Sequence, residues 1–147
     1  AKFGQPVFKF PEPRIDNLDF SFSGLKTSIL YFLKKEIKKD PNFIKDNLND
    51  LCASVQDRIV SILMNKIIKA TEQTGIKQVA IAGGVSANSA LRQALTDNGK
   101  ERGWQTFIPQ FQYCTDNAAM IAINGYYKYQ KQEFVGQDVA PLARYKF

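Results

Sequence analysis

The feature that most constrains the fold is a short apolar run that ends in two glycines. Residues 79–82 are all apolar, and Gly83 and Gly84 follow them. Such a run is typical of a strand covered on both faces, and glycine lets a ligand approach the backbone closely. Ser86 is of a type that caps helices, so we predict a strand, a turn and a helix. Free N–H groups at a helix start bind phosphates, although a tight turn that binds nothing fits the same pattern.

The first half of the chain is predicted to contain two long helices. Apolar residues recur every three or four positions over residues 23–39 and again over 48–74, and Gly75 is well suited to end the second helix. Before these helices, residues 7–10 and 18–22 are predicted to form strands, because prolines flank the first segment and apolar residues alternate in the second.

The second half alternates helix and strand, which favours a parallel sheet. A helix is predicted from Ser86 to about residue 102, followed by a strand over 104–108. The last helix is apolar on nearly all sides over 118–123, so we expect it to lie against a core. We therefore predict one unit of the α/β class, with a strand-rich segment over residues 1–22 and helices around a short parallel sheet over 23–147.

The absence of histidine from the 147 residues excludes several catalytic classes. A Ser-His-Asp or Cys-His arrangement and all His-based zinc motifs need imidazole groups that this chain does not contain. Its two cysteines, Cys52 and Cys114, form no disulfide framework, which favours a reducing, cytoplasmic location. No apolar run is long enough to span a membrane, and no signal peptide is evident. Because the chain begins with Ala1 rather than methionine, we expect it to be a piece of a longer protein.

Asp116 and Asn88 are the candidate functional side chains, and each has two interpretations. Asp116 either caps the following helix or binds a metal ion in a loop after a strand, where α/β folds place ligands. Asn88 either reaches a ligand over the glycine turn or is an exposed polar residue. The net charge of +6 permits an acidic partner such as nucleic acid. A lysine cluster is either a solvated helix end or a nucleic-acid contact: Lys34, Lys35, Lys38 and Lys39.

Three segments together resemble one family. They are DFSFSGLKT at residues 19–27, AGGVSAN at 82–88 followed by Leu91 and Arg92, and CTDNAAMIA at 114–122. In this order they resemble the C-terminal part of the TsaD family, the tRNA N6-adenosine threonylcarbamoyltransferases formerly called glycoproteases. The resemblance implies the C-terminal lobe of the actin/hexokinase/Hsp70-like ATPase fold.

The resemblance also implies an activity and site residues. The activity is transfer of a threonylcarbamoyl group from its adenylate to N6 of the adenosine beside the tRNA anticodon. Gly83 and Gly84 match the family's nucleotide-side turn, Asn88 its adenylate-contacting asparagine, and Asp116 its metal-ligand aspartate. The metal would be iron or zinc, and the nucleotide ATP or threonylcarbamoyl-adenylate. No covalent nucleophile is expected.

The resemblance further implies what this chain lacks. The family's other metal ligands are two histidines of an N-terminal HxxxH helix, so we expect a fragment that is inactive alone. Expected partners are tRNA, the missing N-terminal lobe, and proteins that resemble TsaB and TsaE. Surface left open by the missing lobe would favour self-association.

The alternatives to this function are an ATP-dependent small-molecule kinase lobe, a non-catalytic TsaB-like partner, and a basic RNA-binding domain.

Overall fold

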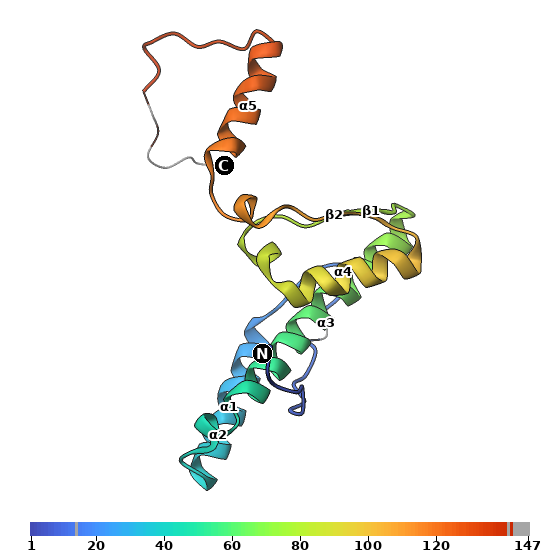
Figure 1. Cartoon of the computed structure of the whole chain (residues 1–147), viewed down its shortest axis with the longest axis vertical. Helices are drawn as coiled ribbons and strands as arrows, with labels where there is room; N and C mark the ends of the chain where they lie inside the picture. Colours follow the sequence, from blue (N-terminus) through green and yellow to red (C-terminus); the bar gives the residue numbers. More distant parts are fainter. Residues whose placement is uncertain (14, 141, 143–147) are drawn as a thin grey trace.

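The computed structural model describes residues 1–13, 15–140 and 142, so the end of the predicted unit lies partly outside the described residues. Helices come first, and a small sheet with further helices follows (Figure 1). In chain order the elements are α1 (Ser23–Lys39), α2 (Phe43–Asp46), α3 (Leu48–Thr74), β1 (Gln78–Ala80), the 3-10 helix η1 (Gly84–Ala87), α4 (Ser89–Arg102), β2 (Gln105–Phe107), the 3-10 helix η2 (Phe111–Tyr113) and α5 (Ala118–Gln130). This combination confirms the predicted α/β class.

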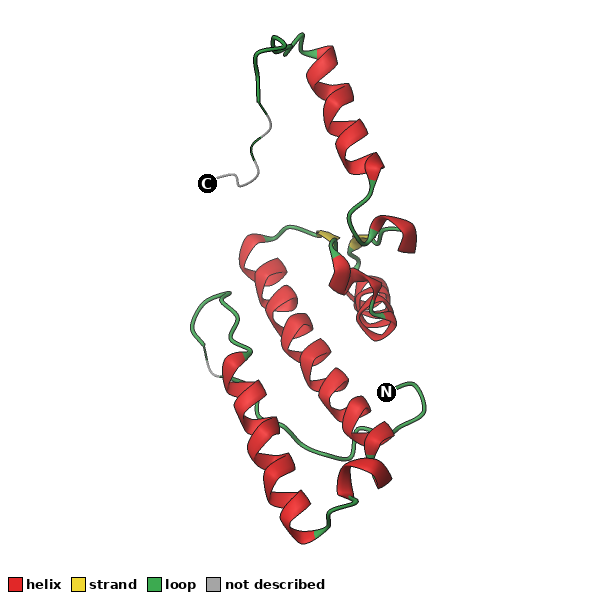
Figure 2. Cartoon of the chain, turned by 90° about the vertical axis from the view of Figure 1, so that its left-hand side faces the viewer, coloured by secondary structure: helices red, strands yellow, loops and turns green. Residues whose placement is uncertain are grey.

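Helix α3 connects the two hydrophobic cores. Its Ile62 packs with Leu25 of α1 and with Phe10, and its Met64 packs with Leu91 and Leu95 of α4. Two residues that are two positions apart on a helix point in directions that differ by roughly 200°, because 3.6 residues make a turn. The helix therefore buries two opposite sides, one against α1 and one against α4 and the sheet. Figure 2 shows α1 and α3 side by side, as the predicted apolar faces of both helices require.

The predicted strands near the N-terminus are wrong. Residues 7–10 and 18–22 pair with no other strand of the described chain. The Phe8 N–H instead donates to the Ser54 hydroxyl of α3 at 3.0 Å. Farther along, the Lys66 ammonium donates to the carbonyls of Ile15 and Asn17 at 3.0 and 2.9 Å. An extended segment becomes a strand only beside another strand, and here side chains of α3 bind the Phe8 N–H and the carbonyls of Ile15 and Asn17 instead.

The predicted parallel sheet is confirmed, but it is shorter and more exposed than expected. Its register pairs Gln78 with Gln105 and Ala80 with Phe107. Only the central residue of each strand is half-buried, because α4 covers one face and no element of the described chain covers the other. The contact with α4 is close, since a Cβ on Gly99 would lie 2.6 Å from Thr106 Cγ2.

Helix α5 does not pack against a core, contrary to the sequence prediction. All of its residues are exposed, including Met120 and Ile121, and Figure 1 shows the helix apart from the other elements. An apolar helix tends to be covered by another surface, but its sequence does not identify that surface. Within the part of the chain that the structure describes, no helix has the length and apolar character of a membrane span.

Removal of the Leu95 side chain tests the second core. Leu95 is 0% exposed, so Leu95→Ala should lower the free energy of unfolding by about 2–5 kcal/mol through lost burial and a new cavity. Urea unfolding followed by circular dichroism measures the change. Leu30 in α1 is 48% exposed, and Leu30→Ala should change stability by no more than about 0.5 kcal/mol. Equal losses in the two variants would contradict the placement of this core.

Candidate functional site

The parallel sheet brings two loops to the same edge. The glycine turn follows β1, and the segment over residues 108–117 follows β2. Because the strands are parallel, both segments leave the sheet at its carboxyl edge, where α/β folds bind ligands. One further hydrogen bond, from the Ile81 N–H to the Phe107 carbonyl at 3.1 Å, extends the pairing toward this edge.

Gly83 forms the turn in a conformation that other residues do not adopt readily. Its φ of 76° and ψ of 179° fall in a region populated essentially by glycine alone. The Ser86 N–H and hydroxyl both donate to the Gly83 carbonyl, at 3.0 and 2.7 Å. The prediction that Ser86 caps the helix is therefore wrong, because its buried hydroxyl closes the turn. Space is open where a Cβ would stand on Gly83 or Gly84, so a ligand can approach the turn.

Asn88 is the N-cap of α4 and not a residue within the helix, although the helix is predicted to begin at Ser86. Its Oδ1 accepts from the Leu91 N–H at 3.0 Å, and its Nδ2 donates to Gln56 Oε1 on α3 at 3.1 Å. Both ends of the amide are thus used within the protein. The predicted contact with an adenylate remains a prediction, and the capping role is one that the sequence interpretation missed.

Two of the sequence motifs meet across an apolar groove. Val85 of the glycine turn lines it together with Phe22 and Lys26 of the DFSFSGLKT segment. Val85 and Asn88 also line a neighbouring cavity of about 430 Å³ between α1 and α3, where Gln56 supplies a second polar side chain. A mostly apolar cavity with a few polar groups is typical of small-ligand sites.

Arg92 joins the two loops of the sheet edge, a role that the sequence interpretation did not assign. Its Nε donates to the Ser86 carbonyl at 2.6 Å, and its Nη2 donates to the Pro109 carbonyl at 2.7 Å and to Cys114 Sγ at 3.0 Å. The guanidinium carbon lies 4.0 Å from the centroid of the Phe111 ring. Cys114 is 2% exposed, so its contact with Arg92 is buried.

Asp116 is exposed and does not cap α5. The cap is Asn117, whose Oδ1 accepts from the Met120 N–H at 3.2 Å. The capping interpretation of Asp116 is therefore wrong. Among residues 1–13, 15–140 and 142, no three His, Cys, Asp or Glu side chains lie close enough to hold a metal ion. The metal-ligand interpretation of Asp116 remains a prediction.

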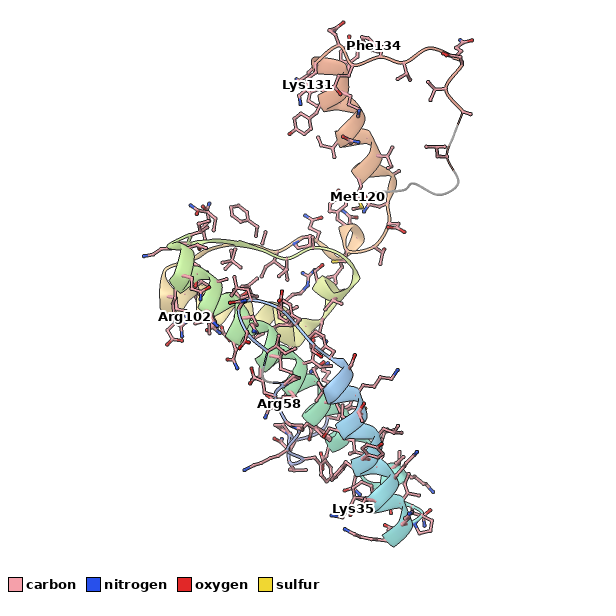
Figure 3. The ribbon with its side chains drawn as sticks, turned by 180° about the vertical axis from the view of Figure 1, so that it is seen from behind. Lys35, Arg58, Arg102, Met120, Lys131 and Phe134 are labelled. Carbon is pink, nitrogen blue, oxygen red and sulfur yellow. The ribbon has the colours of Figure 1, made fainter. Side chains whose placement is uncertain are left out.

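The lysine cluster of α1 does not belong to this site. Lys35 lies at one end of the molecule, away from the sheet, as Figure 3 shows. Within the cluster, Lys39 pairs with Glu36 at 2.7 Å. A role at the sheet edge is therefore not available to these lysines in this arrangement.

Substitutions of Asn88 test its place at the start of α4. Asn88→Ala removes the acceptor for the Leu91 N–H and should cost about 1 kcal/mol of unfolding free energy. Asn88→Asp keeps an acceptor there and should retain most of the stability, although it loses the donor to Gln56. Urea unfolding measures both. Equal stability of wild type and Asn88→Ala would contradict the capping role.

Comparisons of the sequence with known proteins point to one family. A family model described as "TsaD: tRNA N6-adenosine threonylcarbamoyltransferase" matches residues 1–123. A tRNA N6-adenosine threonylcarbamoyltransferase of Christiangramia forsetii is 56% identical over 148 residues, which cover 100% of this chain and 44% of the relative. The namesake of Riemerella anatipestifer is 54% identical over 144 residues, or 97% of this chain and 42% of the relative. The protein of the same name from Thermotoga neapolitana is 44% identical over 138 residues, which cover 91% of this chain and 40% of the relative.

The chain therefore spans less than half the length of these relatives. The family match includes the two segments that meet at the carboxyl edge of the sheet, the glycine turn and the loop with Cys114 and Asp116. On this basis the chain belongs to the TsaD family of tRNA N6-adenosine threonylcarbamoyltransferases.

Proposed function

We propose that this chain is the C-terminal lobe of a tRNA N6-adenosine threonylcarbamoyltransferase with an actin/hexokinase/Hsp70-like fold. The proposal depends mainly on one observation: the glycine turn and the loop that carries Asp116 leave the same edge of a parallel sheet, in a chain of the TsaD family. The relatives' names describe transfer of a threonylcarbamoyl group to N6 of an adenosine in tRNA. In this proposal the whole activity belongs to a longer protein, and residues 1–147 supply one side of its active site.

The glycine turn is proposed to hold the adenosine part of ATP or threonylcarbamoyl-adenylate. Three features support this role: the open space at Gly83 and Gly84, the adjacent apolar cavity, and the amides of Asn88 and Gln56 at its edge. An apolar cavity would accept the base, and the amides would offer polar contacts. Since Asn88 Nδ2 already donates to Gln56, a ligand contact would share or replace that hydrogen bond.

Asp116 is proposed as one ligand of an iron or zinc ion. The described residues contain no group of three or more potential metal ligands, so they do not by themselves fit a complete metal site. The remaining ligands would have to come from outside this chain, and we derive no reaction step through the metal. In the transfer itself, the tRNA amine attacks the carbonyl of the threonylcarbamoyl group and AMP leaves. The share of this chain is to position the adenylate, since orientation alone lowers such barriers considerably.

The partners in this proposal are tRNA, an N-terminal lobe, and proteins that resemble TsaB and TsaE. The exposed apolar side chains of α5, such as Met120, Ile121 and Ile123, support contact of this helix with the surface of another protein or lobe. Large exposed apolar patches mark interaction sites. The same surface supports self-association of this chain when the other lobe is absent.

A tRNA-modification assay tests the incomplete active site. The purified chain alone should give no threonylcarbamoyl transfer above background, while the full-length relative of Christiangramia forsetii, assayed alongside, should be active. A chimera in which this chain replaces the matching 44% of that relative should regain transfer. Turnover by the chain alone would contradict the proposal.

Asp116→Ala in that chimera tests the metal-ligand role. Loss of a direct ligand should reduce transfer by more than the roughly 10- to 100-fold typical of a residue behind the ligands. Bound metal, measured by elemental analysis, should fall in parallel. Asp97→Ala is the matched control, because Asp97 is an exposed carboxylate of α4 whose partner is Gln93. An unchanged rate and metal content in Asp116→Ala would exclude this role.

Gly83→Ala tests the nucleotide role of the turn. An alanine in this conformation costs on the order of 1–3 kcal/mol, so the turn should change shape. We expect ATP to raise the unfolding temperature of the wild-type chain and not that of Gly83→Ala. Gly125→Ala on α5 is the control, because it has an ordinary φ and open space around it. Equal stabilisation of all three proteins by ATP would refute the nucleotide role of this turn.

A further inference from the structure

We propose that Arg92 is a positioning residue that fixes the Asp116 loop relative to the glycine turn. Its contacts link three segments: α4, on which it lies, the turn at Ser86, and the loop at Pro109 and Cys114. As a statement about a site for nucleotide and metal, this inference rests on the function proposed above. As a statement about the loop, it can be tested on this chain alone.

The sheet by itself cannot hold the two loops in place. Each strand has three residues, and Asp116 lies nine positions beyond Phe107, the last residue of β2. Most of the intervening loop is exposed, including Phe111 and Tyr113. Cys114 is its one fully buried side chain, and it is buried at the guanidinium of Arg92. The anchor of the loop is therefore this contact, two residues before Asp116.

The arrangement uses the shape of the guanidinium more than its charge. None of its three acceptors is a carboxylate: two are backbone carbonyls and one is a sulfur. In the described part of the chain no carboxylate lies within ion-pair distance of Arg92, whereas Arg102 on the same helix pairs with Glu72 at 3.5 Å. The planar guanidinium places separate nitrogens on the two loops and stacks on Phe111, whereas a lysine ammonium has one nitrogen and no face for stacking.

Among the described residues, no carboxylate balances the positive charge of Arg92. Arg92 brings a positive charge to the edge of the sheet, between the glycine turn and the loop of Asp116. A cation there attracts a carboxylate or a phosphate group. Arg92 thus holds both loops by hydrogen bonds and favours anionic groups between them, while neither loop needs to contact the other directly.

Selective alkylation of the two cysteines of this chain tests the proposal. Cys52 is exposed and serves as the internal reference in the absence of nucleotide, because it also lines the apolar cavity proposed for the adenosine, and Cys114 is buried. In the wild type, iodoacetamide should modify Cys52 quickly and Cys114 slowly, as followed by peptide mass spectrometry. Arg92→Lys and Arg92→Gln should raise the Cys114 rate at least about tenfold, the factor expected when hydrogen bonds from a charged donor are lost. The Cys52 rate should stay constant.

Arg102→Gln is the matched control, because it removes an arginine from the far end of the same helix and should leave the Cys114 rate unchanged. Urea unfolding of every variant shows whether labelling reports local or global opening. If the Arg92 variants are unfolded, Phe111→Ala replaces them, since Phe111 is exposed and its loss removes only the stacking face. That variant should raise the Cys114 rate several-fold. An unchanged Cys114 rate in the folded variants would overturn the proposal.

Labelling with ATP present separates this proposal from the proposed function. Slower Cys114 labelling with ATP in the wild type, but not in Arg92→Lys, would support coupling between the turn and the loop, a result that a merely structural arginine would not give. Suppose that Cys114 is labelled faster in Arg92→Lys than in the wild type, and that ATP changes the rate in neither protein. This result would support the positioning role and count against the nucleotide site. Protection by ATP that persists in a folded Arg92→Lys would overturn the coupling.

Discussion

The burial of two opposite sides of α3 is the constraint on which the rest of the structure depends. Ile62 joins it to α1, and Met64 joins it to α4 and the sheet. Neither core is complete without α3, since the sheet has only two short strands and α1 packs on no other long helix of the described chain. The position of the glycine turn follows from this packing, because Leu91 and Leu95 orient α4, at whose start the turn lies.

Hydrogen bonds between side chains and the backbone set the shape of the candidate site. Ser86, Asn88 and Arg92 each bond to backbone groups of the turn, the helix start or the neighbouring loop. Buried polar groups need such partners, and a loop that supplies them is held in one conformation. These three side chains hold the edge of the site in place without a ligand. Gly83, Gly84 and Asp116 remain accessible to a ligand.

Two surfaces of the chain are incomplete as seen in isolation. Helix α5 exposes its apolar residues, and one face of the sheet has no cover within the described residues. The chain spans less than half the length of its relatives, and in the function proposed above these two surfaces are where an N-terminal lobe and partner proteins would bind. The cost of leaving them open is an increased tendency to associate through apolar area.

The sequence by itself determined the helices α1, α3 and α4, the parallel order of the two strands, and the family. Apolar periodicity and helix-ending glycines are local signals, and Gly75 ends α3 with a φ of 70° as its position predicted. Only the tertiary structure decided that residues 7–10 and 18–22 pair with no strand, that α5 is uncovered, and that Asn88 rather than Ser86 caps α4. It also decided the role of Arg92. These outcomes depend on which groups lie within hydrogen-bonding or packing distance after folding, and no local pattern carries that information.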